Sequence, residues 1–172
     1  MTATTNLAIQ PISQLARAIK AGELSPVELT ECMLARVKAL NPTLKAFNTV
    51  TAEQALTQAR AAEQEINSGN YRGPLHGIPV GLKDLLQTKG TRTTVSSKIL
   101  KDWVPDSNAT VVDKLEAAGA ISLGKLNMTE FALSGYHPDL EVPVNPWNPD
   151  HWPGVSSSGS GVATAARLCC AT

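Results

Sequence analysis

The residues best suited to chemistry are a lysine in an apolar stretch and a run of serine and glycine near the end of the chain. The run, residues 153–161, reads Pro-Gly-Val-Ser-Ser-Ser-Gly-Ser-Gly. The lysine, Lys83, follows the apolar segment 78–82. When rigid elements hold a lysine and a serine together, the amine can activate the hydroxyl as a nucleophile. These two segments therefore predict a lysine–serine site.

Lys83 has two interpretations that the sequence leaves open. Burial in an apolar strand disfavours the ammonium form and lowers the pKa, so that a neutral amine becomes available as a general base. Alternatively, Lys83 lies at a strand end and extends to water or pairs with Asp84. Because neighbouring residues of a strand point to opposite faces, Asp84 is expected to be structural. His76, a lone loop histidine, receives no role.

The serine-rich run also has alternatives without catalysis. It could be a flexible linker or an anion-binding loop that opens a helix. The small residues 162–168, which predict a helix directly after it, argue against a linker. The run lacks the lysine and spacing of a phosphate-binding Walker loop, and it does not match a Gly-x-Ser-x-Gly nucleophile elbow.

The elements that must position these residues begin with three predicted helices. Apolar residues at helical spacing from Ile12 to Ile19 predict the first. Ser25 and Glu28 form a capping box for a second, which should end before Pro42. Thr51 is the expected N-cap of a third. Residues 1–70 are therefore interpreted as an N-terminal helical region, with a short extended segment at 44–50.

The remainder, residues 71–172, alternates between strands and helices and predicts an α/β fold with a sheet covered by helices. The expected elements are strands at 78–82 and 120–123, a helix capped by Ser107 or Asn108, and a helix at 128–133. Residues 135–155 form a long proline-rich connection, in which Tyr136, Trp147 and Trp152 favour an ordered, packed loop.

Composition excludes several classes of protein. Fifteen basic residues balance fifteen acidic ones, so no electrostatic footprint for nucleic acid or an anionic membrane exists. No apolar run could span a bilayer, and residues 1–6 lack the features of a signal peptide. Three cysteines form neither a disulfide framework nor a metal-binding pattern and fit a reduced cytoplasm. We expect a cytoplasmic protein without metal.

Four segments, in order, resemble motifs of the amidase signature family. Residues 73–84, Gly-Pro-Leu-His-Gly-Ile-Pro-Val-Gly-Leu-Lys-Asp, are similar to its lysine motif. Residues 124–132 resemble its next strand–helix segment, and residues 145–148 the approach to its serine loop. Residues 153–161 resemble the loop Gly-Gly-Ser-Ser-Gly-Gly-Ser. The N-terminal helices are compatible with the family's variable start.

The resemblance implies an α/β fold with a mixed central sheet covered by helices. It also implies hydrolysis of carbon–nitrogen bonds in carboxamides through a Ser–cis-Ser–Lys triad, with no cofactor. Lys83 would be the base, and Ser156, on a cis peptide bond, would relay a proton to the nucleophile. Ser157, Gly154 and Gly159 would support the loop. The implied partner is a small amide substrate, without nucleic acid or membrane, and a homodimer of the intact enzyme is compatible with the family.

The resemblance places the acylated serine, in a Gly-Gly-Ser turn, beyond Thr172. The sequence thus looks like the N-terminal part of an amidase with an incomplete sheet, and we expect negligible amidase activity from it alone. Two alternatives are the A-type subunit of a glutamyl-tRNA amidotransferase and a non-catalytic truncated product. Val155 and Arg167 stand where the family's glycines would be usual, so Arg167 needs a partner or an exposed position.

Overall fold

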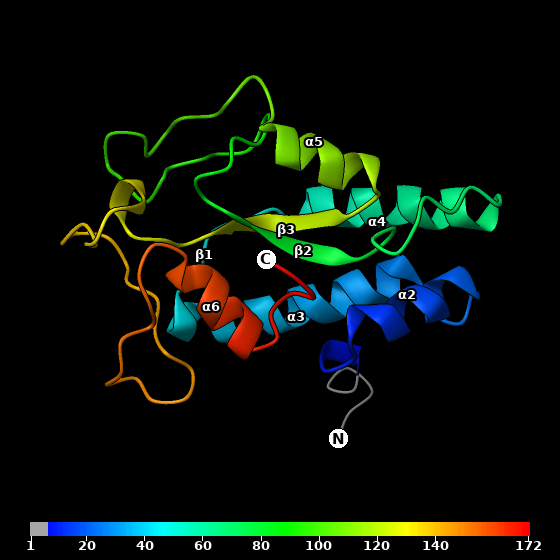
Figure 1. The fold of residues 1–172 in the computed structure, drawn as a ribbon, viewed down its shortest axis with the longest axis horizontal. Helices are drawn as coiled ribbons and strands as arrows, with labels where there is room; N and C mark the ends of the chain where they lie inside the picture. Colours follow the sequence, from blue (N-terminus) through cyan, green and yellow to red (C-terminus); the bar gives the residue numbers. More distant parts are fainter. Residues whose placement is uncertain (1–6) are drawn as a thin grey trace.

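A small three-stranded sheet between helices organises the chain (Figure 1). The computed structural model describes residues 7–172; residues 1–6, on which the expectation of no signal peptide rests, lie outside this range. The sheet has the order β1-β3-β2, in which β3 pairs antiparallel with β1 and parallel with β2. The strands are β1 (Phe47–Val50), β2 (Pro79–Lys83) and β3 (Ile121–Leu126). This mixed sheet confirms the predicted fold class.

Helices lie on both sides of the sheet (Figure 1). In that view α5 lies above the strands, whereas α2, α3 and α6 lie below them, and α4 packs against α3 and β3. The helices are α2 (Ile12–Lys20), α3 (Pro26–Leu44), α4 (Ala52–Asn67), α5 (Thr110–Ala117) and α6 (Ser158–Ala165), with one 3-10 turn, η1 (Glu130–Ala132). The apolar side chains between these layers form one core cluster that includes β2 and β3.

The start of α3 agrees with the sequence, but its predicted end is wrong. The Ser25 hydroxyl accepts hydrogen bonds from the N–H groups of Val27 and Glu28, at 3.0 and 3.2 Å. The helix continues through Pro42 to Leu44. Its last turn is held because the Asn41 side chain accepts from the Phe47 N–H at 2.8 Å and donates to the Phe47 carbonyl at 3.2 Å. These tertiary bonds offset the helix bond that proline cannot make.

Of the two other predicted caps, Thr51 is confirmed as the N-cap residue of α4, whereas the cap predicted at Ser107 or Asn108 is wrong. Thr51 makes no side-chain cap on α4; instead its hydroxyl donates to the Ser122 carbonyl at 3.3 Å. The N-cap of α5 is Ala109, because the Asn108 carboxamide accepts from the Lys89 N–H at 2.7 Å and so ties two loops together. In both cases a polar residue near a helix start binds a backbone group elsewhere in the chain.

The helix predicted at 128–133 is also absent, and only η1 forms there. The Met128 N–H donates to the Asn127 and Ser96 side-chain oxygens, at 2.7 and 3.2 Å. Phe131 and Ala132 both have positive φ, which ends any helix. By contrast, α6 begins at Ser158, earlier than the predicted residue 162, so it includes part of the serine run.

Residues after α6 lie beside β2. Ala171 forms a parallel bridge with Val80, and the Cys170 N–H donates to the Pro79 carbonyl at 3.0 Å.

The three cysteines are free thiols, and burial raises the pKa of Cys169 to about 12. Within residues 7–172, no helix is long and apolar enough to cross a membrane.

The proline-rich connection at 135–155 is only partly packed. The Tyr136 ring lies 5.6 Å from the Trp152 ring, and its hydroxyl donates to the Gly154 carbonyl at 3.1 Å. Trp147, however, is 85% exposed.

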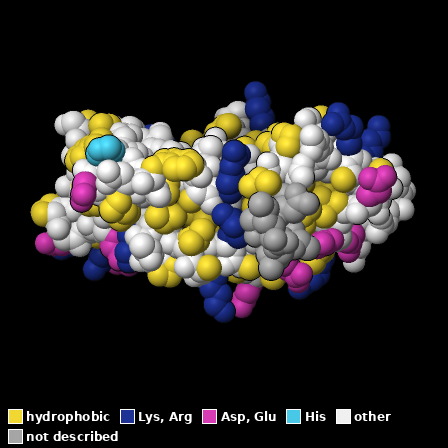
Figure 2. All heavy atoms as spheres, turned by 90° about the horizontal axis from the view of Figure 1, so that it is seen from below, with side chains coloured by type: hydrophobic (Ala, Val, Ile, Leu, Met, Phe, Trp, Pro, Cys, Tyr) yellow, Lys and Arg dark blue, Asp and Glu magenta, His cyan; other side chains and the backbone are white. Residues whose placement is uncertain are grey.

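The face seen from below Figure 1 carries hydrophobic side chains in several patches between lysines and arginines (Figure 2).

Candidate active site

Lys83 and Ser156 meet at the end of β2, although 73 positions separate them in sequence. The Lys83 Nζ donates a hydrogen bond of 2.7 Å to the Ser156 Oγ. Lys83 is the last residue of β2 and is half-buried, whereas the four strand residues before it are buried. Burial lowers the pKa of Lys83 below the usual lysine value. The contact therefore joins a hydroxyl to an amine whose neutral form is favoured by its surroundings.

The serine loop reaches this position through unusual backbone angles. Gly154 has a φ of 103°, and Ser156 a φ of 41°, in the left-handed region that costs energy for any residue with a Cβ. No cis peptide bond occurs within residues 7–172, so the cis bond implied for Ser156 is not what the structure shows. The left-handed Ser156 makes the sharp turn instead, on a trans bond.

Two backbone hydrogen bonds fasten this loop to the segment after β3. The Thr129 N–H donates to the Ser156 carbonyl at 3.3 Å, and the Gly159 N–H donates to the Asn127 carbonyl at 2.9 Å. A Cβ at Gly159 would lie 2.3 Å from the Asn127 carbonyl oxygen and 2.6 Å from that of Ala46. Gly159 thus allows the loop to approach the sheet, which gives it a physical role in the site.

Ser157 and Ser158 are placed differently from Ser156. Ser157 is the exposed N-cap of α6 and makes no side-chain capping bond, whereas Ser158 is buried in the first turn. Val155, at the position of a family glycine, has an ordinary φ and is 52% exposed, so the valine is accommodated.

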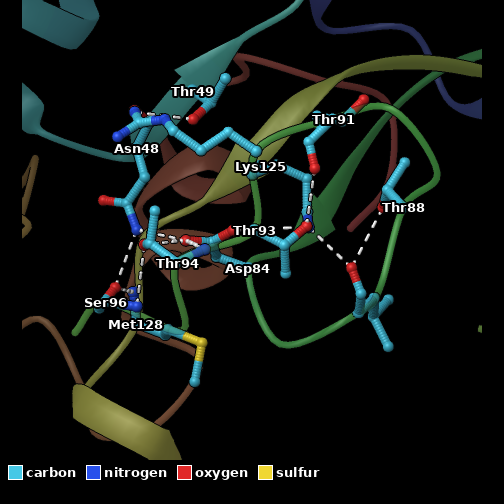
Figure 3. Close-up of polar contacts among 12 residues, drawn as sticks. Asn48, Thr49, Asp84, Thr88, Thr91, Thr93, Thr94, Ser96, Lys125 and Met128 are labelled. Atoms are coloured by element: carbon cyan, nitrogen blue, oxygen red, sulfur yellow. Dashed lines mark hydrogen bonds and ion pairs between the residues drawn. The ribbon is translucent and has the colours of Figure 1, made fainter. Parts of the chain in front are cut away.

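Asp84 lies in a buried polar cluster (Figure 3). Its Oδ2 accepts from the Thr94 N–H, the Thr94 hydroxyl and the Asn48 amide, at 3.1, 2.5 and 2.9 Å. Its Oδ1 lies 3.4 Å from the Lys125 Nζ. The alternative in which Lys83 pairs with Asp84 is therefore wrong, because Lys125 is the cation that faces this carboxylate.

Lys125 is a buried residue that the sequence patterns did not predict as part of the site. It belongs to β3, is fully buried, and donates to the Leu86 carbonyl at 2.7 Å and the Thr93 hydroxyl at 2.6 Å (Figure 3). Burial lowers the pKa of Lys125, and the Asp84 carboxylate opposes that shift. A lysine within the apolar strand segment 121–126 was the available signal, the same one that drew attention to Lys83.

The polar cluster extends from Asp84 to the serine loop. The Asn48 amide that binds Asp84 also donates to the Ser96 hydroxyl at 2.8 Å. That hydroxyl donates to the Asn127 Oδ1 at 3.0 Å, and the Asn127 carbonyl receives the Gly159 N–H. A continuous set of hydrogen bonds thus connects the end of β2 with the loop that carries Ser156.

His76 lies outside this site, in a packed position. Its Nδ1 accepts from the Arg72 N–H at 3.1 Å, and its Nε2 lies 3.2 Å from the Glu65 carboxylate. The side chain is 1% exposed, and burial lowers its pKa, a shift that Glu65 opposes. Among residues 7–172, no group of three or more metal-ligating side chains is found.

The comparisons with known proteins agree with the serine and lysine motifs. Residues 28–172 match the model of the family described as Amidase. This chain belongs to the amidase family. It is 50% identical over 158 residues to a putative amidase, AmiD, of Mycobacterium tuberculosis, a match that covers 92% of the chain and 33% of that protein.

Other amidase-family relatives differ in what their names say. The chain is 52% identical over 159 residues to the A-type subunit of the glutamyl-tRNA(Gln) amidotransferase of Azotobacter vinelandii, with coverages of 91% and 33%. Native peptide amidase from Stenotrophomonas maltophilia superposes with a TM-score of 0.87 at 37% identity, over 94% of this chain and 35% of that one. The chain thus spans about a third of the length of the relatives it matches.

Proposed function

We propose that this chain supplies the lysine and relay serine of an amidase that hydrolyses carbon–nitrogen bonds in small carboxamides. The observation that carries the proposal is the 2.7 Å hydrogen bond between Lys83 Nζ and Ser156 Oγ. A lysine with a lowered pKa, bound to a hydroxyl, is an arrangement that can move a proton during acyl transfer. Membership of the amidase family supports the same reaction class.

In the proposed reaction each group has one task. The neutral Lys83 amine takes the proton of Ser156, and Ser156 in turn takes the proton of the serine that attacks the amide carbonyl. Protonated Lys83 then returns the proton, through Ser156, to the departing amine. The acylated serine lies outside this sequence in the proposal, so we expect negligible amide turnover from the 172-residue chain by itself.

The second candidate is the A-type component of a glutamyl-tRNA amidotransferase, favoured by the 52% identity to such a protein. The same lysine–serine pair would then release ammonia from an amide for a partner to use. The two candidates differ in partner dependence. Ammonia release by the protein alone supports the amidase, whereas release that requires added amidotransferase partner proteins supports the second.

The test begins with the DNA that follows codon 172. If an in-frame Gly-Gly-Ser segment follows, the whole product is expressed and assayed for ammonia release from small carboxamides. We expect Lys83→Met and Ser156→Ala each to lower kcat at least about 100-fold, the scale of a lost proton-transfer group. Full activity in either variant would contradict the roles proposed for Lys83 and Ser156, whereas a stop codon at this point would leave the non-catalytic product as the better account.

A further inference from the structure

We propose that Ser156 is itself an acyl acceptor, so that the 172-residue chain takes an acyl group from activated esters. The inference rests on the lysine–serine pair of the proposed function but asks for a different reaction. In the proposed amidase Ser156 only relays a proton. Here its oxygen forms a covalent bond to the acyl carbon.

The first support is that a relay serine and a nucleophilic serine both need a base that removes the hydroxyl proton. To relay a proton, Ser156 must lose its own proton to Lys83, and at that moment its oxygen is nucleophilic. The Lys83 amine lies at hydrogen-bond distance, and Ser156 is only partly buried.

The second support is the backbone around Ser156. Its left-handed φ places it at a sharp turn directly before the N-cap of α6, and a strained turn ahead of a helix is how nucleophile elbows present a serine hydroxyl. The first N–H groups of a helix have no partner inside the helix. Within residues 7–172, the N–H groups of Ser157 and Ser158 donate to no protein acceptor. They are available to a developing oxyanion.

The third support is that the loop is held in place. Thr129 and Asn127 bind it from the segment after β3, and the hydrogen bonds from Asp84 through Asn48 and Ser96 fix that segment relative to β2. The distance between the amine and the hydroxyl is therefore set by the fold, and it does not require a bound substrate to form.

The reaction with p-nitrophenyl acetate balances without another reactant. The Ser156 hydroxyl proton passes to the Lys83 amine while the Oγ bonds to the acetyl carbonyl carbon. The carbon–oxygen bond to the nitrophenyl group then breaks and releases p-nitrophenolate. The products are an acetyl ester on Ser156, a protonated Lys83 and one nitrophenolate per chain. No oxidation or reduction occurs.

The experiment treats the 172-residue chain with p-nitrophenyl acetate at neutral pH and follows the burst of nitrophenolate and the intact mass. We expect the addition of one acetyl group, mapped by peptide mass spectrometry to Ser156 and removed by hydroxylamine, which cleaves esters but not amides. Ser156→Ala should abolish this adduct. Lys83→Met and Lys83→Arg should each slow its formation at least about 100-fold, since neither offers a neutral amine.

Matched controls are Ser68→Ala and Lys38→Met, which change an exposed serine at the end of α4 and an exposed lysine of α3. Both should keep the rate within about twofold, in line with the small effects of such surface changes. An acetyl amide on Lys83, an ester on another serine, or no adduct would overturn the proposal. If a Lys83 variant fails to fold, the identity of the acetylated residue in the wild-type chain decides whether the proposal holds. A negative result leaves the proton relay of the proposed amidase untouched, because that role needs no bond to Ser156.

Discussion

Removal of the Lys125 ammonium should be the most damaging single change to the buried cluster. In Lys125→Met the Asp84 carboxylate, which is fully buried, loses the cation 3.4 Å away, and the Leu86 carbonyl and Thr93 hydroxyl lose a donor. Breaking a buried ion pair from one side costs about 3–5 kcal/mol, a large share of the roughly 5–15 kcal/mol that stabilises a domain.

The double variant distinguishes the effect of the two charges on stability from the effect of the changed side-chain volumes. Asp84→Asn should also cost about 3 kcal/mol, since it strands the Lys125 charge. Asp84→Asn combined with Lys125→Met leaves no unpaired charge, so its loss should be no larger than that of either single variant. The coupling energy between the two positions is then about 3 kcal/mol.

The assay is urea denaturation of the four proteins, followed by circular dichroism, with Lys98→Met as the matched control. Lys98 also pairs with a carboxylate, that of Asp139, but both side chains are about half-exposed or more. Its loss should change the free energy of unfolding by less than about 1 kcal/mol. Strictly additive losses at positions 84 and 125 would refute the reasoning, because they would mean that the two charges do not interact.

Four further substitutions are expected to alter stability or its dependence on pH. Gly124→Ala should lower the free energy of unfolding, measured by urea denaturation, by at least about 2 kcal/mol, because its Cβ would lie 2.1 Å from the Thr49 carbonyl oxygen. Gly73 has a similar φ but open space around it, so Gly73→Ala should lower the free energy of unfolding about half as much. Arg167→Gly should raise the free energy of unfolding by about 1 kcal/mol, since this exposed residue ends α6 at a φ of 57°. The burial-lowered pKa of His76 adds stability that is complete above the unfolded pKa of about 6.5 and is lost as the pH falls below it. His76→Asn should flatten this dependence in urea midpoints measured between about pH 7 and 5; an unchanged slope would contradict the assignment.

The elements that local patterns encode were predictable. Regular apolar spacing predicted α2, and Ser25 as an N-cap predicted the start of α3, because these signals depend on residues close in sequence. The sheet between helices followed from the alternation of helices and strands, and its mixed pairing from the family resemblance. Lys83 and the serine run were recognisable from their residue types.

Several of the wrong predictions involve partners distant in sequence. Asn108 resembles an N-cap but binds the backbone of Lys89, and Met128 begins a helix-like pattern but binds Ser96. The contact between Lys125 and Asp84 could not be predicted from the sequence, since only the pairing of β3 beside β2 brings the two side chains together. Arg167, which stands where a glycine is usual in the family, is accommodated because its side chain is exposed after the end of α6.

The central claim is that Lys83 is a desolvated amine bound to Ser156, and the titration of its side chain tests this most directly. With carbon-13-labelled lysine, NMR can follow the Lys83 signal, assigned by its absence in Lys83→Met. We predict a midpoint below the ordinary lysine value of about 10.4 and a signal that moves in Ser156→Ala but not in Ser68→Ala. A Lys83 midpoint at the ordinary value, with no response to Ser156→Ala, would contradict the account.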